Sequence, residues 1–122
     1  MNKKNPVIVY VGNDDRATDF MEASDTYVLG APTLQIALAQ IMFSNPDAII
    51  IDATPENMLI AEDTYFHLRT LRNLPVVVLS DMPGRWDTTK HQEVSVLLND
   101  ASAEEIMAEL QHSGTQELAE IR

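Results

Sequence analysis

The chain has 122 residues, of which 45% are hydrophobic and 22% charged, and these values predict a single globular domain with its own core. Its net charge of −11 argues against direct binding to nucleic acid or to an anionic membrane surface, because both depend on Lys and Arg side chains. No apolar stretch approaches the roughly 18 residues of a membrane span, and there is no cysteine for disulfides or thiolate chemistry. We therefore expect a cytoplasmic protein.

The first part of the chain predicts two strands and two helices in alternation. Residues 6–11 are apolar without a break, as in a strand buried on both faces, and a short strand is expected at 27–29. A helix of roughly 16–23 lies between them, with Asp14 or Asp15 as its cap. A second helix opens at Pro32 and has one apolar face, which consists of Leu34, Ala37, Leu38, Ile41 and Met42.

A third strand, at residues 48–51, is apolar throughout and organises the rest of the chain. Asn45-Pro46 precedes it and Pro55 follows it, so that turn residues punctuate both ends. Asp52 stands at its carboxyl end, which is the edge where open α/β sheets bind their ligands. Asp52 is therefore the main candidate for a functional residue.

Two further strands complete the pattern. The run at 74–79 ends in Ser80, and the run at 94–98 ends before Asn99-Asp100. The segment between them contains Trp86, the single tryptophan, which no periodic pattern places in a core. Trp86 is interpreted either as a loop residue folded onto the domain or as a partner anchor.

Helical patterns follow the third and fifth strands. One helix is expected to begin at Asp63 or Thr64, with Tyr65, Leu68 and Leu71 facing inward. The last helix begins with a capping box of Ser102 and Glu105 and ends before Gly114. Its apolar face consists of Ala103, Ile106, Met107 and Leu110.

Five strands that alternate with helices predict an α/β fold, a flavodoxin-like doubly wound parallel sheet with the strand order 2-1-3-4-5. We expect one domain at 1–114, followed by a polar tail or the start of a linker at 115–122. Strands one and three are neighbours in this order, so the turn at 12–15 should lie beside Asp52.

With these landmarks the chain resembles a receiver domain, the phosphoacceptor module of two-component response regulators. Pro46-Asp47 matches the Pro-Asp pair that precedes the third strand of receivers. The resemblance implies that Asp52 is the phosphoacceptor and that Ser80 is the switch hydroxyl at the end of the fourth strand. It covers nearly the whole chain.

Other landmarks of the family are missing. Gly12-Asn13 stands where receivers have an acidic pair, with Asp14 and Asp15 two residues on. Asn99 replaces the lysine after the fifth strand, and Val96 replaces the switch aromatic on that strand. Losing a cation about 4 Å from a developing anion costs about 4 kcal/mol at an effective dielectric near 20. The sequence therefore resembles a degenerate member, or pseudo-receiver.

We expect such a domain to be non-enzymatic, to need no cofactor and to act by phosphorylation-independent protein–protein interaction. The resemblance implies that the fourth helix, fifth strand and fifth helix form the contact face, with Trp86 and Val96 as candidate contacts. The partner would be an output domain, a kinase, another regulator or a second copy of the chain.

Two other functions stay open. An atypical receiver would be phosphorylated on Asp52 by a histidine kinase, with Asp14, Asp15 and Asp52 holding Mg²⁺. A small-molecule sensor would have a deep apolar pocket near Gly12 and Ser80. A purely structural interpretation leaves Asp52 as a solvated carboxylate at a strand end and Ser80 as a hydroxyl that bonds nearby backbone.

Overall fold

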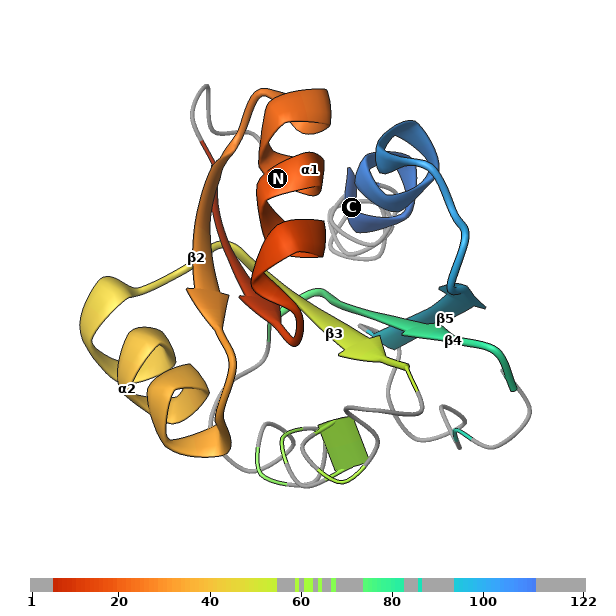
Figure 1. Ribbon diagram of the computed structural model, residues 1–122. Helices are drawn as coiled ribbons and strands as arrows, with labels where there is room; N and C mark the ends of the chain where they lie inside the picture. The colour runs from red at the N-terminus through yellow and green to blue at the C-terminus, as the bar shows by residue number, and fades with distance from the viewer. Residues whose placement is uncertain are drawn as a thin grey trace, which may run out of the picture.

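The computed structural model describes residues 6–54, 59, 61, 62, 64, 67, 74–82, 86 and 94–111. Its centre is a parallel sheet of five strands in the order β2-β1-β3-β4-β5 (Figure 1), as the sequence predicts. The strands are β1 (Val7–Val11), β2 (Tyr27–Ala31), β3 (Ala48–Ala53), β4 (Val76–Ser80) and β5 (Val94–Leu98). None of the helices in the described ranges is long and apolar enough to cross a membrane.

Helices cover both faces of the sheet. Helix α1 (Asp14–Ser24) and the helix of residues 103–111, drawn in blue, lie on one face in Figure 1. Helix α2 (Leu34–Ser44) lies on the other face, together with the helical residues of the 59–67 segment. β1, β2 and β3 are parallel and are joined through α1 and α2, which is the arrangement of βαβ units.

Alternation along the strands divides the core into two clusters. The cluster under α1 and the 103–111 helix contains Ile8, Tyr10, Phe20, Ile50, Leu79, Ile106 and Leu110. The cluster under α2 contains Val9, Val11, Ala37, Ile41, Ile49, Ile51, Val78 and Trp86. β1, β3 and β4 supply both clusters because they are covered on both faces, which explains why these strands have continuous apolar runs.

The helix starts differ from the prediction in their capping residues. Asn13, and not Asp14 or Asp15, is the N-cap of α1, and its Oδ1 accepts hydrogen bonds from the amides of Asp15 and Arg16. Thr33 is the N-cap of α2, so Pro32 precedes the helix. Helix α1 therefore begins two residues earlier than expected, because an asparagine satisfies the free amides of a first turn as well as an aspartate does.

Two predictions about the other helices can be judged. The capping box of the last helix is confirmed, since Ser102 and Glu105 exchange side chain to backbone hydrogen bonds. The helix expected from Asp63 or Thr64 begins earlier, because residues 59, 61 and 62 are already helical. Its predicted inward residues Tyr65, Leu68 and Leu71, and also Gly114 and the tail at 115–122, lie outside the described residues.

The prediction that Met42 packs inward is wrong. Its side chain is 64% exposed, whereas Ala37 and Ile41 of the same helix are buried. The spacing of apolar residues gave the wrong face because α2 is apolar on nearly all sides. Periodicity alone therefore cannot select the face that packs on the sheet.

Candidate functional site

Asp52 lies in a sealed position near the carboxyl end of β3. Its exposed fraction is 0%, so the interpretation of a solvated strand-end carboxylate is wrong. Strand alternation places it on the same face as Tyr10 of β1, which pairs with Ile50 of β3. The Tyr10 hydroxyl donates a hydrogen bond of 2.8 Å to Asp52 Oδ2.

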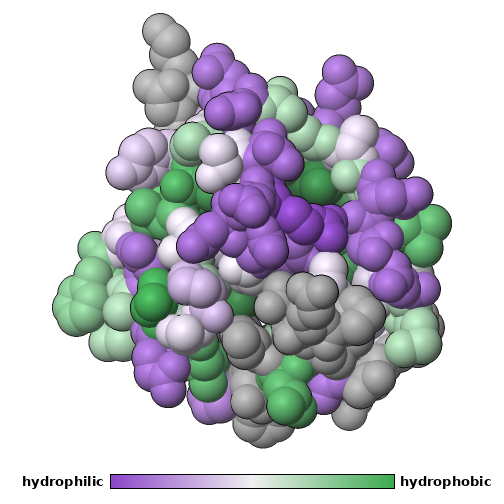
Figure 2. Space-filling model, in the orientation of Figure 1, coloured by the Kyte–Doolittle hydropathy of each residue, from purple (hydrophilic) through white to green (hydrophobic). Residues whose placement is uncertain are grey.

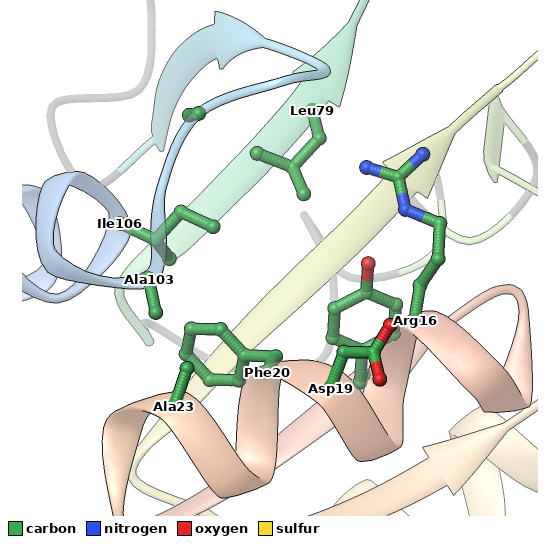
Figure 3. Close-up of a pocket in the computed structure, with 9 residues that line it drawn as sticks. Arg16, Asp19, Phe20, Ala23, Leu79, Ala103 and Ile106 are labelled. Atoms are coloured by element: carbon green, nitrogen blue, oxygen red, sulfur yellow. The ribbon is translucent and has the colours of Figure 1, made fainter.

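Arg16 closes the site from above the sheet. It lies in the first turn of α1, and its Nε is 3.1 Å from Asp52 Oδ2. Its Nη2 donates a hydrogen bond of 2.6 Å to the carbonyl oxygen of Asn99, which follows β5. One side chain thus joins α1, β3 and the turn after β5, and Figure 3 shows its guanidinium group extended over the sheet.

Burial dominates the electrostatics of this cluster. It raises the pKa of Asp52 above its usual value of 3.8, although the Tyr10 hydrogen bond and the Arg16 charge both act to lower that pKa. Burial and the nearby Asp52 carboxylate also raise the pKa of Tyr10, so the phenol stays protonated and remains a donor. Asp52 Oδ1 is buried without a hydrogen-bond partner, which adds to the cost of the charged form.

The acidic residues of the 12–15 turn, Asp14 and Asp15, are not grouped with Asp52. Asp14 and Asp15 are exposed. Asp14 Oδ1 lies against Gly30 of β2, where a Cβ atom would come within 3.1 Å of it. Gly12 donates its amide hydrogen bond to Ala31, also in β2. Within the part of the chain that the structure describes, no three acidic or histidine side chains are grouped to hold a metal ion. The predicted set of Asp14, Asp15 and Asp52 therefore does not fit Mg²⁺.

Ser80 is buried but separated from Asp52. It pairs with Ala53, the next residue of β3, so alternation places the two side chains on opposite faces of the sheet. Its Oγ accepts a hydrogen bond of 3.1 Å from the amide of Met82. This agrees with the structural interpretation of a strand-end hydroxyl that bonds nearby backbone.

A pocket of about 230 Å³ opens beside the cluster, between α1 and the 103–111 helix. Figure 3 shows its walls, with Phe20 and Asp19 on α1, Leu79 on β4 and Ile106 on the facing helix. This pocket is not the one predicted near Gly12 and Ser80, because neither residue lines it. Its volume is below the roughly 300 to 1,000 Å³ of ordinary ligand sites.

Trp86 and Val96 are less available for contacts than predicted. Trp86 is only 8% exposed and belongs to the core cluster under α2, so its interpretation as an exposed partner anchor is wrong. Val96 is half-buried and packs against the same cluster. Both side chains therefore pack in or against the core, and only part of Val96 is exposed.

Comparison with solved structures identifies the architecture. The N-terminal domain of a response regulator/sensory box/GGDEF protein from Carboxydothermus hydrogenoformans matches with a TM-score of 0.69 at 17% identity, over 95% of this chain and 99% of that one. The chain has the receiver fold. A response regulator receiver modulated diguanylate cyclase from Pelobacter carbinolicus gives 0.68 at 18% identity, over 96% and 99% of the two chains. No family model and no curated protein matches the sequence.

A domain described as a pseudo-receiver has a similar structure. The pseudo-receiver domain of the CikA protein matches with a TM-score of 0.65 at 19% identity, over 89% of this chain and 96% of that one. Receivers and pseudo-receivers therefore share this fold at this level of identity. The geometry around Asp52 is needed to distinguish the two classes.

Sequence reasoning missed Tyr10 and Arg16, the two residues that hold Asp52 in this receiver fold. Each had a signal in the sequence. Tyr10 is the one residue with a polar group in an otherwise aliphatic strand, and Arg16 is the only Lys or Arg between Lys4 and Arg69. A lone cation beside the predicted acceptor strand indicates a charge partner for its carboxylate.

Proposed function

We propose that this chain is a regulatory domain of receiver fold that acts through protein contacts, without phosphorylation of Asp52. The observation that carries the proposal is the sealed carboxylate, with Oδ2 bound by Tyr10 and Arg16 and no exposed surface. The similarity to receiver domains, a pseudo-receiver among them, supports the receiver-fold part of the proposal.

Phosphorylation would need the opposite environment. The attacking carboxylate oxygen must meet an incoming phosphoryl group in line, and a divalent cation must neutralise the charge that develops. Here Oδ2 already accepts a hydrogen bond from Tyr10 and is ion-paired with Arg16, and Oδ1 has no exposed surface. Burial also raises the pKa of Asp52, which disfavours the anionic nucleophile.

Arg16 takes over the role of a counter-charge inside the domain. In the receivers that the sequence resembles, a lysine after the fifth strand pairs with the phosphoryl oxygens, whereas here that position is Asn99. Arg16 binds Asp52 directly and the Asn99 carbonyl as well. The domain therefore holds a fixed ion pair where a receiver would exchange a metal and a phosphoryl group.

The proposed contact face is the β5 side of the sheet, with the adjoining fourth-helix region and the 103–111 helix. β5 is an edge strand in which Val94 to Val96 are half-buried and Leu98 is exposed. Most of the fourth-helix region lies outside the described residues. The partner would be an output domain, a kinase or another regulator, bound constitutively.

The test is a titration of the full chain with Mg²⁺ and beryllofluoride, followed by backbone amide NMR shifts. We expect no saturable shift at Asp52, Asn99 or β5 at millimolar ligand. Asp52→Asn serves as the matched control, because it keeps the size of the side chain and removes the nucleophile.

Saturable shifts that disappear in Asp52→Asn would overturn the proposal. They would favour the alternative, an atypical receiver phosphorylated on Asp52 by a histidine kinase. Arg16 would then have to release Asp52 as the ligand binds, and shifts at the Arg16 side chain would report that movement.

A further inference from the structure

Helix α2 has a solvent-facing stripe that is uncharged and mostly apolar. The stripe consists of Gln35, Ile36, Ala39, Met42 and Phe43, all of which are exposed. Ile36 is 39%, Met42 64% and Phe43 83% exposed. A helix that is apolar on its outer face as well as its inner face is normally covered on both sides.

The surroundings of the stripe are uncharged as well. No Asp, Glu, Lys or Arg occurs between Asp25 and Asp47, a stretch that contains all of β2 and α2 and is the longest uncharged stretch of the sequence. β2 is also an edge strand, and it lacks the charges and prolines that usually protect such edges. In Figure 2 the side of the molecule where Figure 1 places α2 has green and white residues with purple ones between them.

We infer that the α2 stripe is a contact between two copies of this chain. Charge indicates the edge at which two copies would meet. Two molecules of net charge −11 repel one another at most orientations, and the uncharged edge is where they meet without opposing carboxylates. A basic partner would bind the acidic faces of the molecule instead.

The spacing of the stripe suits a two-fold axis. Ile36 and Met42 lie three residues on either side of Ala39, and Gln35 and Phe43 lie four residues on either side. If two α2 helices pack antiparallel about Ala39, Ile36 meets Met42 of the partner copy and Gln35 meets Phe43 of the partner copy. The small Ala39 at the centre lets the helices approach closely. Such self-complementarity is what an isologous dimer requires.

This inference does not depend on the state of Asp52, and it uses the opposite edge of the sheet from the proposed β5 contact. The experiment is sedimentation velocity on the full chain from about 5 to 500 µM, a range suited to a weak dimer. We expect a dimer with a Kd of about 10 to 100 µM. The Kd should fall as salt is raised from about 50 to 500 mM, because screening weakens the repulsion between the copies.

Three variants locate the contact. Phe43→Glu should raise the Kd at least about a hundredfold, since the buried charge occurs twice in a symmetric interface. Leu59→Glu is the matched control, because Leu59 is 79% exposed on another helical segment and receives the same charge. Leu98→Glu probes the β5 face.

The outcomes separate the two proposals. A wild-type chain that stays monomeric at the highest concentration would overturn the dimer and leave the β5 contact untouched. A dimer that survives Phe43→Glu and is lost in Leu98→Glu would also overturn the inference, and would place self-association on β5. A dimer whose Kd rises with salt would contradict the charge argument.

Discussion

Replacing Arg16 by alanine tests the ion pair on which the proposed function depends. The change removes the cation paired with a carboxylate that is fully buried in the wild-type chain, and leaves the Tyr10 hydrogen bond. Breaking a buried ion pair by removing one partner costs about 3–5 kcal/mol. The Arg16 side chain is 35% exposed, so solvent screens part of the interaction, and we expect a loss of about 2–3 kcal/mol in the free energy of unfolding at pH 7.5.

The pH dependence of that loss follows from the raised pKa of Asp52. The folded state binds the Asp52 proton more tightly than the unfolded state, so this residue contributes stability that is lost as pH rises through the interval above 3.8. Without Arg16 the folded pKa rises further, and ionised Asp52 costs more at neutral pH. The loss caused by Arg16→Ala should therefore shrink as pH is lowered from 7.5 towards 3.8, because protonated Asp52 needs no counter-charge.

Urea unfolding followed by far-UV circular dichroism measures the loss at each pH. Asp52→Asn provides the control, since it keeps a side-chain oxygen for Tyr10 and Arg16 and removes the charge. In that background Arg16→Ala should cost about 1 kcal/mol or less, and the difference between backgrounds is the coupling energy. A cost at pH 7.5 below about 0.5 kcal/mol, or equal costs in the two backgrounds, would refute the ion-pair argument.

Other changes probe the neighbouring contacts. Tyr10→Phe removes a buried hydrogen bond to a carboxylate and should destabilise the chain by about 1.5–3 kcal/mol in urea unfolding at pH 7.5, whereas a near-zero effect would mean that Asp52 is hydrated. Asn13→Ala should cost about 1 kcal/mol through loss of the α1 cap, and Asn13→Asp should restore most of it. Asp25→Gly should stabilise by about 0.5–1 kcal/mol, because Asp25 has a left-handed φ of 55°, and a loss of stability would contradict this. Trp86, the single tryptophan, should resist quenching by acrylamide, and ready quenching would show that it is exposed.

The sheet could be predicted from the sequence because burial on both faces leaves a clear pattern. β1, β3 and β4 have continuous apolar runs bounded by turn residues, and their order follows from the alternation with helices. Helix faces were harder, as Met42 shows. Intrinsic apolarity cannot distinguish the side that packs on the sheet from a side that meets a partner.

The site was only half predictable. Asp52 and Ser80 follow from their positions at strand ends, but a sequence does not state which way each side chain points. Tyr10 and Arg16 lie 42 and 83 residues from their partners Asp52 and Asn99 along the chain. Contacts of such separation depend on the register of β1 against β3 and on where α1 begins, and the cap of α1 was assigned to the wrong residue.

Under the proposed function, the position of the cation explains how a receiver fold can persist without phosphorylation. A phosphoacceptor site with neither metal nor lysine would leave a buried carboxylate uncompensated, which costs several kcal/mol. Arg16 supplies the charge from the first turn of α1 and also binds the carbonyl of Asn99, so it fixes the turn between β5 and the 103–111 helix. Movement of that turn would require breaking the hydrogen bond of 2.6 Å between Arg16 Nη2 and the Asn99 carbonyl oxygen. This hydrogen bond forms without a phosphoryl group. This bond favours one arrangement of the turn after β5, as the proposed constitutive contact requires.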